Sequence, residues 1–87
     1  MHDYLLLAYS GTSRASLTIT YSNWLAVHDA AEIDLINADE LDPSEAAEVA
    51  DVVRNLDLRD QATRDELLRV LHMAAGSEQG LTVLPAA

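Results

Sequence analysis

The sequence predicts a small α+β domain. An N-terminal antiparallel β-hairpin, open to extension into a sheet of three or four strands, is expected to pack against two C-terminal amphipathic helices. Residues 16–22 alternate between apolar and polar side chains, as a strand with one buried face does. Residues 43–56 and 63–75 instead place apolar side chains at helical spacing. The 87 residues, 49% of them hydrophobic, suffice for a single domain with one core over residues 1–87.

The two hairpin strands are predicted at residues 3–10, DYLLLAYS, and 16–22, SLTITYS. In the second strand, leucine and isoleucine alternate with threonine. The segment SGTSRA between them has the glycine and small hydroxyl residues of a hairpin turn. The same residue types can cradle a phosphate. However, this segment lacks the Gly-Lys-Ser/Thr of a P-loop and joins two strands, so a turn is favoured.

Residues 22–37 fit two interpretations. A short helix over 24–30, capped by Ser22, would place four side chains on one face, namely Trp24, Val27, His28 and Ala31. The same stretch could instead form a further strand. In both interpretations the alternation of EIDLI predicts a strand near residues 32–36.

The first C-terminal helix is predicted to begin at Asp42, an N-cap acid followed by proline at the first helical position. Its apolar face comprises Ala46, Val49, Ala50, Val53 and Leu56.

The second C-terminal helix is predicted to begin at the capping box TRDE, in which Thr63 is the N-cap. It buries Leu67, Val70, Leu71 and Ala74 and ends at Gly76. The tail, residues 76–87, is expected to add an edge strand through Leu81–Leu84, which Pro85 ends.

Charge is distributed unevenly along the chain. The formal net charge is −10, and residues 29–53 contain nine acidic residues without one lysine or arginine. The segments before and after this stretch are nearly neutral. A negative surface repels nucleic acid and anionic membranes, so neither is an expected partner. Basic proteins are the partners that such a surface attracts.

Helix formation explains part of this acidity, because Asp42 is a cap and Glu45 lies in the favourable first turn. Glu45, Glu48 and Asp51 are spaced at i, i+3, where like charges weakly destabilise a helix. Keeping these charges without interleaved arginines indicates a use in binding. We call the eight predicted partner-binding residues the acidic surface: Asp29, Glu32, Asp34, Asp39, Glu40, Glu45, Glu48 and Asp51.

Motifs for a metal, a cofactor or catalysis are weak, and we predict none of these. His28 with Asp29 and Glu32 could bind a metal, but a partly buried ring beside Trp24 is the more common arrangement. The segment after Asn37 begins like a calcium loop, yet has leucine and aspartate where an EF-hand needs a ligand and a glycine. Without cysteine, lysine or a recognisable nucleophile, we predict no enzyme activity.

The sequence therefore predicts a protein-binding module that presents an acidic surface to a basic, nucleic-acid-binding partner and competes with nucleic acid. Small phage inhibitors of restriction or CRISPR systems share this size and charge, an analogy that no motif strengthens. The alternative is a structural or regulatory α+β domain, homodimeric through the YLLLAY edge, whose acidity serves solubility or salt adaptation. No apolar run is long enough to span a bilayer, so a cytoplasmic location is expected.

Overall fold

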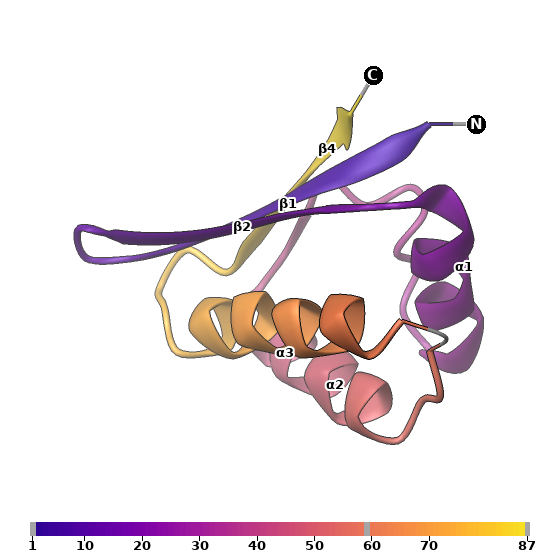
Figure 1. The fold of residues 1–87 in the computed structure, drawn as a ribbon. Helices are drawn as coiled ribbons and strands as arrows, with labels where there is room; N and C mark the ends of the chain where they lie inside the picture. The colour runs from indigo at the N-terminus through magenta and orange to yellow at the C-terminus, as the bar shows by residue number, and fades with distance from the viewer. Residues whose placement is uncertain (1, 59, 87) are drawn as a thin grey trace.

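The protein forms two layers, a four-stranded antiparallel sheet with three helices on one face (Figure 1). The computed structural model describes residues 2–58 and 60–86, and all counts refer to them. The strands are β1 (Asp3–Ser10), β2 (Ser13–Ile19), β3 (Glu40–Leu41) and β4 (Leu81–Ala86), in the order β2-β1-β4-β3. The helices are α1 (Tyr21–Ala30), α2 (Pro43–Arg54) and α3 (Gln61–Ala75). The predicted α+β class is confirmed, and none of these helices is long and apolar enough to cross a membrane.

The β1–β2 hairpin closes through a two-residue turn that begins with Gly11. Gly11 has a φ of 62°, in the left-handed region that glycine occupies without strain. Because the turn is this short, Ser10 already pairs with Ser13, and β2 begins three residues earlier than predicted. The strand ends at Ile19 because Thr20 is the N-cap of α1.

Helix α1 confirms the helical interpretation of residues 24–30, although the helix starts earlier. Its cap is Thr20, whose hydroxyl accepts a hydrogen bond from the Asn23 amide at 3.2 Å; the predicted cap, Ser22, lies inside the helix. Trp24 and Val27 are fully buried on the predicted face.

The strand predicted near residues 32–36 is absent, and these residues form an irregular loop with bends at 32, 33 and 36. Leu35 is fully buried, and both of its backbone groups are bonded to side chains of α1. Since these hydrogen bonds already satisfy the backbone, the segment does not need a neighbouring strand.

Helix α2 begins as predicted, with Asp42 as N-cap and Pro43 first, and Ala46, Val49, Ala50 and Val53 are buried on its apolar face. It ends at Arg54, so Leu56, predicted on that face, lies beyond the helix and is only partly buried. Helix α3 begins before the predicted site. Its N-cap is Asp60, whose carboxylate accepts the amides of Ala62 and Thr63. The predicted capping box is therefore wrong, and Thr63 lies in the first turn. A carboxylate at the N-terminus, favoured by the helix dipole, extends the helix by almost a turn.

The C-terminal strand β4 was predicted to be an edge strand, and this is wrong. It pairs with β1 on one side and with β3 on the other. It also continues past Pro85, whose ring nitrogen carries no N–H. The amide of Val83 bonds to Asp39 on the β3 side at 2.8 Å, so the nitrogen of Pro85 lies on that same side, beyond the end of β3. In the alternative interpretation, a homodimer was to form through the YLLLAY edge. That route is wrong, because β1 is paired on both sides and has no free edge.

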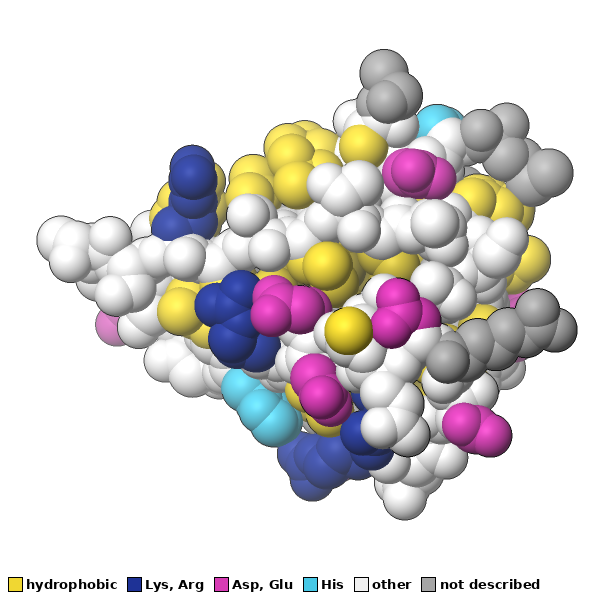
Figure 2. All heavy atoms as spheres, in the orientation of Figure 1, with side chains coloured by type: hydrophobic (Ala, Val, Ile, Leu, Met, Phe, Trp, Pro, Cys, Tyr) yellow, Lys and Arg dark blue, Asp and Glu magenta, His cyan; other side chains and the backbone are white. Residues whose placement is uncertain are grey.

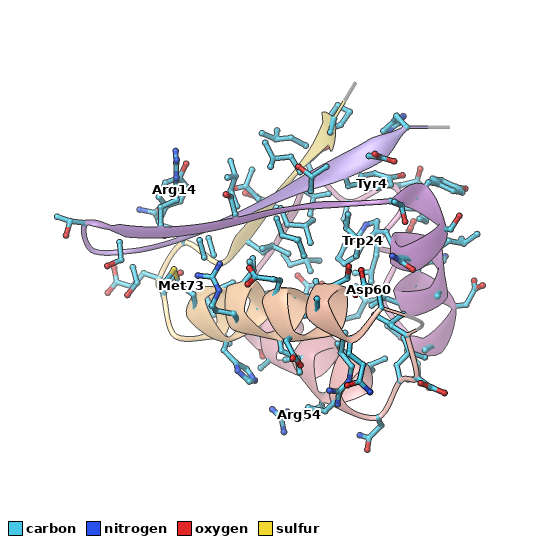
Figure 3. All side chains as sticks on the ribbon, viewed as in Figure 1. Tyr4, Arg14, Trp24, Arg54, Asp60 and Met73 are labelled. Atoms are coloured by element: carbon cyan, nitrogen blue, oxygen red, sulfur yellow. The ribbon has the colours of Figure 1, made fainter. Side chains whose placement is uncertain are left out.

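The core lies between the sheet and the helices. It is filled by Tyr4, Leu6 and Ala8 of β1 and by the buried faces of the other elements. In Figure 3, Trp24 points into this layer, whereas Arg14 points to the other side of the sheet, which no helix covers.

Candidate functional site

Two carboxylates at the start of α2 hold the helix terminus. Asp42 accepts the Glu45 amide at 2.7 Å, and Glu45 in turn accepts the Asp42 amide at 3.1 Å. This capping box satisfies two amides that the helix leaves unpaired. Glu45 therefore has a structural role in addition to any role in binding.

Asp34 organises the loop that follows α1. Its carboxylate accepts the amides of Ile36 and Asn37, both at 3.2 Å, and the side-chain amide of Asn37 at 3.0 Å. The hydrogen bond from the Asn37 side chain, followed by that from its backbone, lowers the pKa of Asp34 below its ordinary value. The charge of Asp34 is thus used within the loop, which limits what it can offer a partner.

Four carboxylates surround one hollow beside the β3–α2 junction. Glu40, Asp42 and Glu45 come from this junction, and Glu78 comes from the connection between α3 and β4. The hollow has a volume of about 330 Å³, and we call these four residues the acidic hollow. Sequence reasoning missed Glu78, which lies 33 residues after Glu45. The only local signal was Gly80, whose turn folds that connection against β3.

The remaining predicted residues lie on several neighbouring elements. Asp29 is at the end of α1, Glu32 is in the loop, and Glu48 is on the outer side of α2, all exposed. Asp39 borders a different hollow, together with His2 and Pro85. The structure therefore brings Glu40 and Glu45 together and places Asp39 at a separate position.

The acidic surface has few basic neighbours. Asp51 forms an ion pair with Arg54 at 3.0 Å, and Asp34 lies 3.8 Å from Nδ1 of His28. Within residues 2–58 and 60–86, the other six carboxylates form no ion pair. Their negative charge is therefore largely uncompensated by these residues.

Helix α3 is different, because its two acidic side chains both lie beside arginines of the same helix. Arg69 pairs with Glu66 at 2.8 Å, and Arg64 lies 3.7 Å from Asp65. Figure 2 shows this face, where dark blue and magenta side chains are neighbours. The excess of acid thus belongs to the other elements rather than to the whole molecule.

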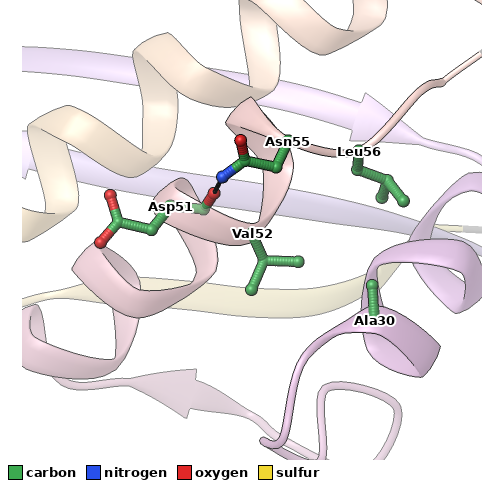
Figure 4. A pocket seen from close by; sticks show the side chains of 5 residues that line it. All are labelled: Ala30, Asp51, Val52, Asn55 and Leu56. Atoms are coloured by element: carbon green, nitrogen blue, oxygen red, sulfur yellow. Dashed lines mark hydrogen bonds between the residues drawn. The ribbon is translucent and has the colours of Figure 1, made fainter.

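Helix α2 lies between helix α1 and helix α3. On one flank, Val52 and Leu56 face Ala30 of α1 across a hollow (Figure 4). The carboxylate of Asp51 points away from Ala30. On the other flank, Arg54 reaches α3, where its Nη2 lies 3.4 Å from Nε2 of His72. Glu45 and Glu48, seven and four residues before Val52, lie on the same side of α2 as Val52.

The histidine and carboxylate side chains of residues 2–58 and 60–86 form no metal-binding group. No three His, Asp or Glu side chains in this part of the chain gather closely enough to hold a metal ion. The two carboxyls with displaced pKa values, Asp34 and Asp60, are both lowered by hydrogen bonds. A general acid at neutral pH needs the opposite displacement.

Comparison with known proteins found no matching family model, no similar curated protein and no similar solved structure. No function is therefore transferred to this chain from a relative. What the protein does has to be argued from its surface.

Proposed function

We propose that this protein is a non-enzymatic binding module whose acidic surface, extended by Glu78, binds a basic groove on another protein. One observation carries the proposal: six of the eight acidic-surface carboxylates form no ion pair within the described residues, whereas both carboxylates of α3, Asp65 and Glu66, lie beside arginines. Repulsion between unpaired like charges destabilises the free protein slightly. A basic partner removes this repulsion and gains charge-assisted hydrogen bonds.

The partner of this module is a protein that itself binds nucleic acid. A net charge of −10 disfavours direct contact with DNA, RNA or anionic lipid. The same charge steers the module toward a groove evolved to hold phosphates, where it competes with nucleic acid. In its finer form, the proposal makes the chain a cytoplasmic inhibitor of the phage type, directed against restriction or CRISPR proteins. This finer form is supported only by the analogy of size and charge.

A pull-down with a matched pair of variants tests the proposal. The immobilised protein is exposed to a bacterial lysate, and bound proteins are eluted by a gradient from about 50 to 500 mM NaCl. The test variant changes Glu32, Glu48 and Glu78 to Gln. None of these side chains makes a hydrogen bond or ion pair among the described residues, so the fold should be unaffected. The control variant changes Asp65 to Asn and Glu66 to Gln on α3.

Binding proteins should elute early in the gradient, should be displaced by added double-stranded DNA, and should be lost with the test variant alone. If the same proteins bind the test variant with unchanged salt dependence, the acidic surface is not the binding site. If DNA fails to displace a protein that the acidic surface does bind, competition with nucleic acid is wrong.

A further inference from the structure

The face of the sheet opposite the helices carries a hydrophobic strip. It consists of Leu5, Leu7 and Tyr9 of β1 and Leu84 of β4, flanked by the small hydroxyl residues Ser16 and Thr18 of β2. Leu84 is 41% exposed and is the one large hydrophobic side chain classed as exposed among the described residues. In Figure 2, yellow side chains gather along the upper side of the molecule, beyond the sheet. We call this surface the open face.

Charged groups stand at opposite ends of the open face. Asp3 begins β1, and Arg14 of β2 is paired in register with Tyr9, six residues further along β1. At about 3.4 Å per residue, the two charges are roughly 20 Å apart. Neither side chain forms an ion pair within the described part of its own chain. The labelled Arg14 in Figure 3 points away from the helices.

This pattern of charge is self-complementary. Consider two copies whose open faces face each other, related by a two-fold axis. The axis lies midway between the two sheets and runs perpendicular to the strands. This rotation of 180° places the Asp3 end of one copy over the Arg14 end of the other. Arg14 of each copy then lies over the Asp3 end of the other, which brings two opposite-charge pairs together. The same rotation places Leu5 of one copy against Leu7 of the other. Isologous dimers are built from such self-complementary patches.

We propose that the open face binds a second copy of this chain in this arrangement, forming a face-to-face sheet dimer. Sheets pack in this way about 10 Å apart, with their strand directions within roughly 30° of each other. Glu40, on the short edge strand, is the open face's other charged side chain and lies at its rim, where solvent screens it. The dimer leaves α2 and the loop after α1 on its two outer sides, so the carboxylates of these two elements stay apart. The Glu40 side chains of the two copies meet at one rim of the interface, which weakens the dimer.

The size of the open face predicts a weak, reversible dimer. Three long strands at about 4.8 Å spacing and about 20–25 Å in length give a flat area of roughly 290–360 Å² per copy. Stable interfaces bury about 800 Å² per partner, so dissociation in the micromolar range or weaker is expected. Screening of the repulsion between two chains of charge −10 should strengthen the dimer as salt is added. This is opposite in sign to the salt dependence of binding to a basic partner, so the two proposals can fail separately.

Sedimentation velocity of the whole chain from about 1 μM to 1 mM measures the dimer directly. We expect a monomer–dimer equilibrium. Leu84→Thr keeps a strand-favouring residue but removes apolar area from the open face, so it should raise the dissociation constant about tenfold. A protein that stays monomeric at about 1 mM and moderate salt would overturn the proposal.

A charge swap identifies the arrangement. Arg14→Asp and Asp3→Arg, each alone, should weaken the dimer about tenfold or more, and the double variant should restore it to within about threefold. Restoration can arise only between copies, because the two residues are too far apart within one chain. The control swap Glu66→Arg with Arg69→Glu on α3 should leave the dissociation constant unchanged. A dimer that persists in Leu84→Thr and in both single charge variants would show that a different surface, such as the edge of β2, joins the copies.

Discussion

The indole Nε1 of Trp24 donates a hydrogen bond of 3.0 Å to the carbonyl oxygen of Leu35, and both side chains are fully buried. The amide of Leu35 donates to Nδ1 of His28 at 3.1 Å. One turn of α1 therefore pairs both backbone groups of a residue in the following loop. Because buried backbone groups are costly when unpaired, these two bonds position the loop that leads to the acidic surface.

Trp24→Phe should therefore lower the free energy of unfolding by more than the smaller ring alone would explain. The substitution leaves the Leu35 carbonyl buried without a donor, which costs about 1–3 kcal/mol, in addition to the cost of the cavity. Urea unfolding monitored by circular dichroism measures the change. Tyr21→Phe is the control, since the Tyr21 hydroxyl makes no hydrogen bond among the described residues. Equal effects of the two substitutions would show that the hydrogen bond contributes nothing.

Gly80 should be intolerant of any side chain. A Cβ at this position would lie 2.1 Å from the carbonyl oxygen of Leu41, and φ is 71°. Both the clash with rigid backbone and the left-handed conformation oppose alanine. Gly80→Ala should therefore lower the free energy of unfolding by more than about 2 kcal/mol, measured by thermal denaturation. It should also disturb the acidic hollow, whose residues adjoin the contacted backbone.

Gly11→Ala is the matched control for this prediction. Gly11 has a similar φ of 62°, but a Cβ there would meet nothing within 4 Å. Its substitution should cost only the conformational strain, about 1–2 kcal/mol. If the two alanine variants are equally stable, the close approach of Gly80 to β3 is not a constraint on the fold.

The start of α3 should be sensitive to acid. The Thr63 hydroxyl, which donates to the Asp60 carboxylate at 2.8 Å, is the largest cause lowering the pKa of Asp60, followed by the amide of the same residue. A lowered pKa in the folded state means that ionised Asp60 stabilises the protein above its unfolded pKa. This contribution is lost as the pH falls through the folded value, in a window below about pH 4.

NMR titration of the side-chain carboxyls tests this cause. In the wild type, Asp60 should titrate at lower pH than an unperturbed aspartate, and in Thr63→Val its pKa should move back upward. Asp60→Asn retains a capping acceptor, so its melting temperature should fall less than that of the wild type between pH 5 and about pH 3. A Thr63→Val protein with an unchanged Asp60 titration would contradict the assigned cause.

The helices with strong local signals were predictable from the sequence. Asp42-Pro43 at the start of α2 and its apolar positions up to Val53 were predicted correctly, because a cap and an amphipathic stripe act over one or two turns. Leu56 was also assigned to this face, but the helix ends before it. The turn at Gly11 is shorter than predicted. The whole segment SGTSRA was taken as the turn, whereas the strands already pair at Ser10 and Ser13. Thr63 was predicted as the cap of α3 because TRDE has the spacing of a capping box. The amides that bond to the Asp60 carboxylate show that Asp60 is the cap instead.

Long-range pairing was what the sequence could not predict. The alternation of residues 32–36 resembles a strand, but Trp24 and His28 satisfy the backbone of Leu35, and no local pattern reports such bonds. The tail strand was expected at an edge because proline has no N–H to donate to a neighbouring strand. Pro85 lacks that donor only at its own position, which lies beyond the end of β3. The two residues of β3 carry too little pattern to be recognised before β4 is placed.

The sequence predicted which segment of the chain is rich in acid, but not how the acidic side chains are arranged in space. Counting charges found the excess of acid, yet could not show that Glu78 joins Glu40 and Glu45 around one hollow. Nor could it show that Asp34 is used within its own loop, while Asp51 has an arginine three residues further along α2. Those distinctions depend on where side chains point after folding.

The excess of acid on α2 should itself reduce stability. Glu48 lies three residues after Glu45 and three before Asp51, and like charges at this spacing cost a few tenths of a kcal/mol per pair. Glu48→Gln should therefore raise the melting temperature at low salt, since glutamate and glutamine have similar helix propensities. Glu66→Gln, which removes the pair with Arg69, should lower it slightly. Both differences should shrink in about 0.5 M NaCl. A stabilising role for Glu48 at low salt would mean that its charge is needed by the fold, and would remove one reason for assigning it to a partner.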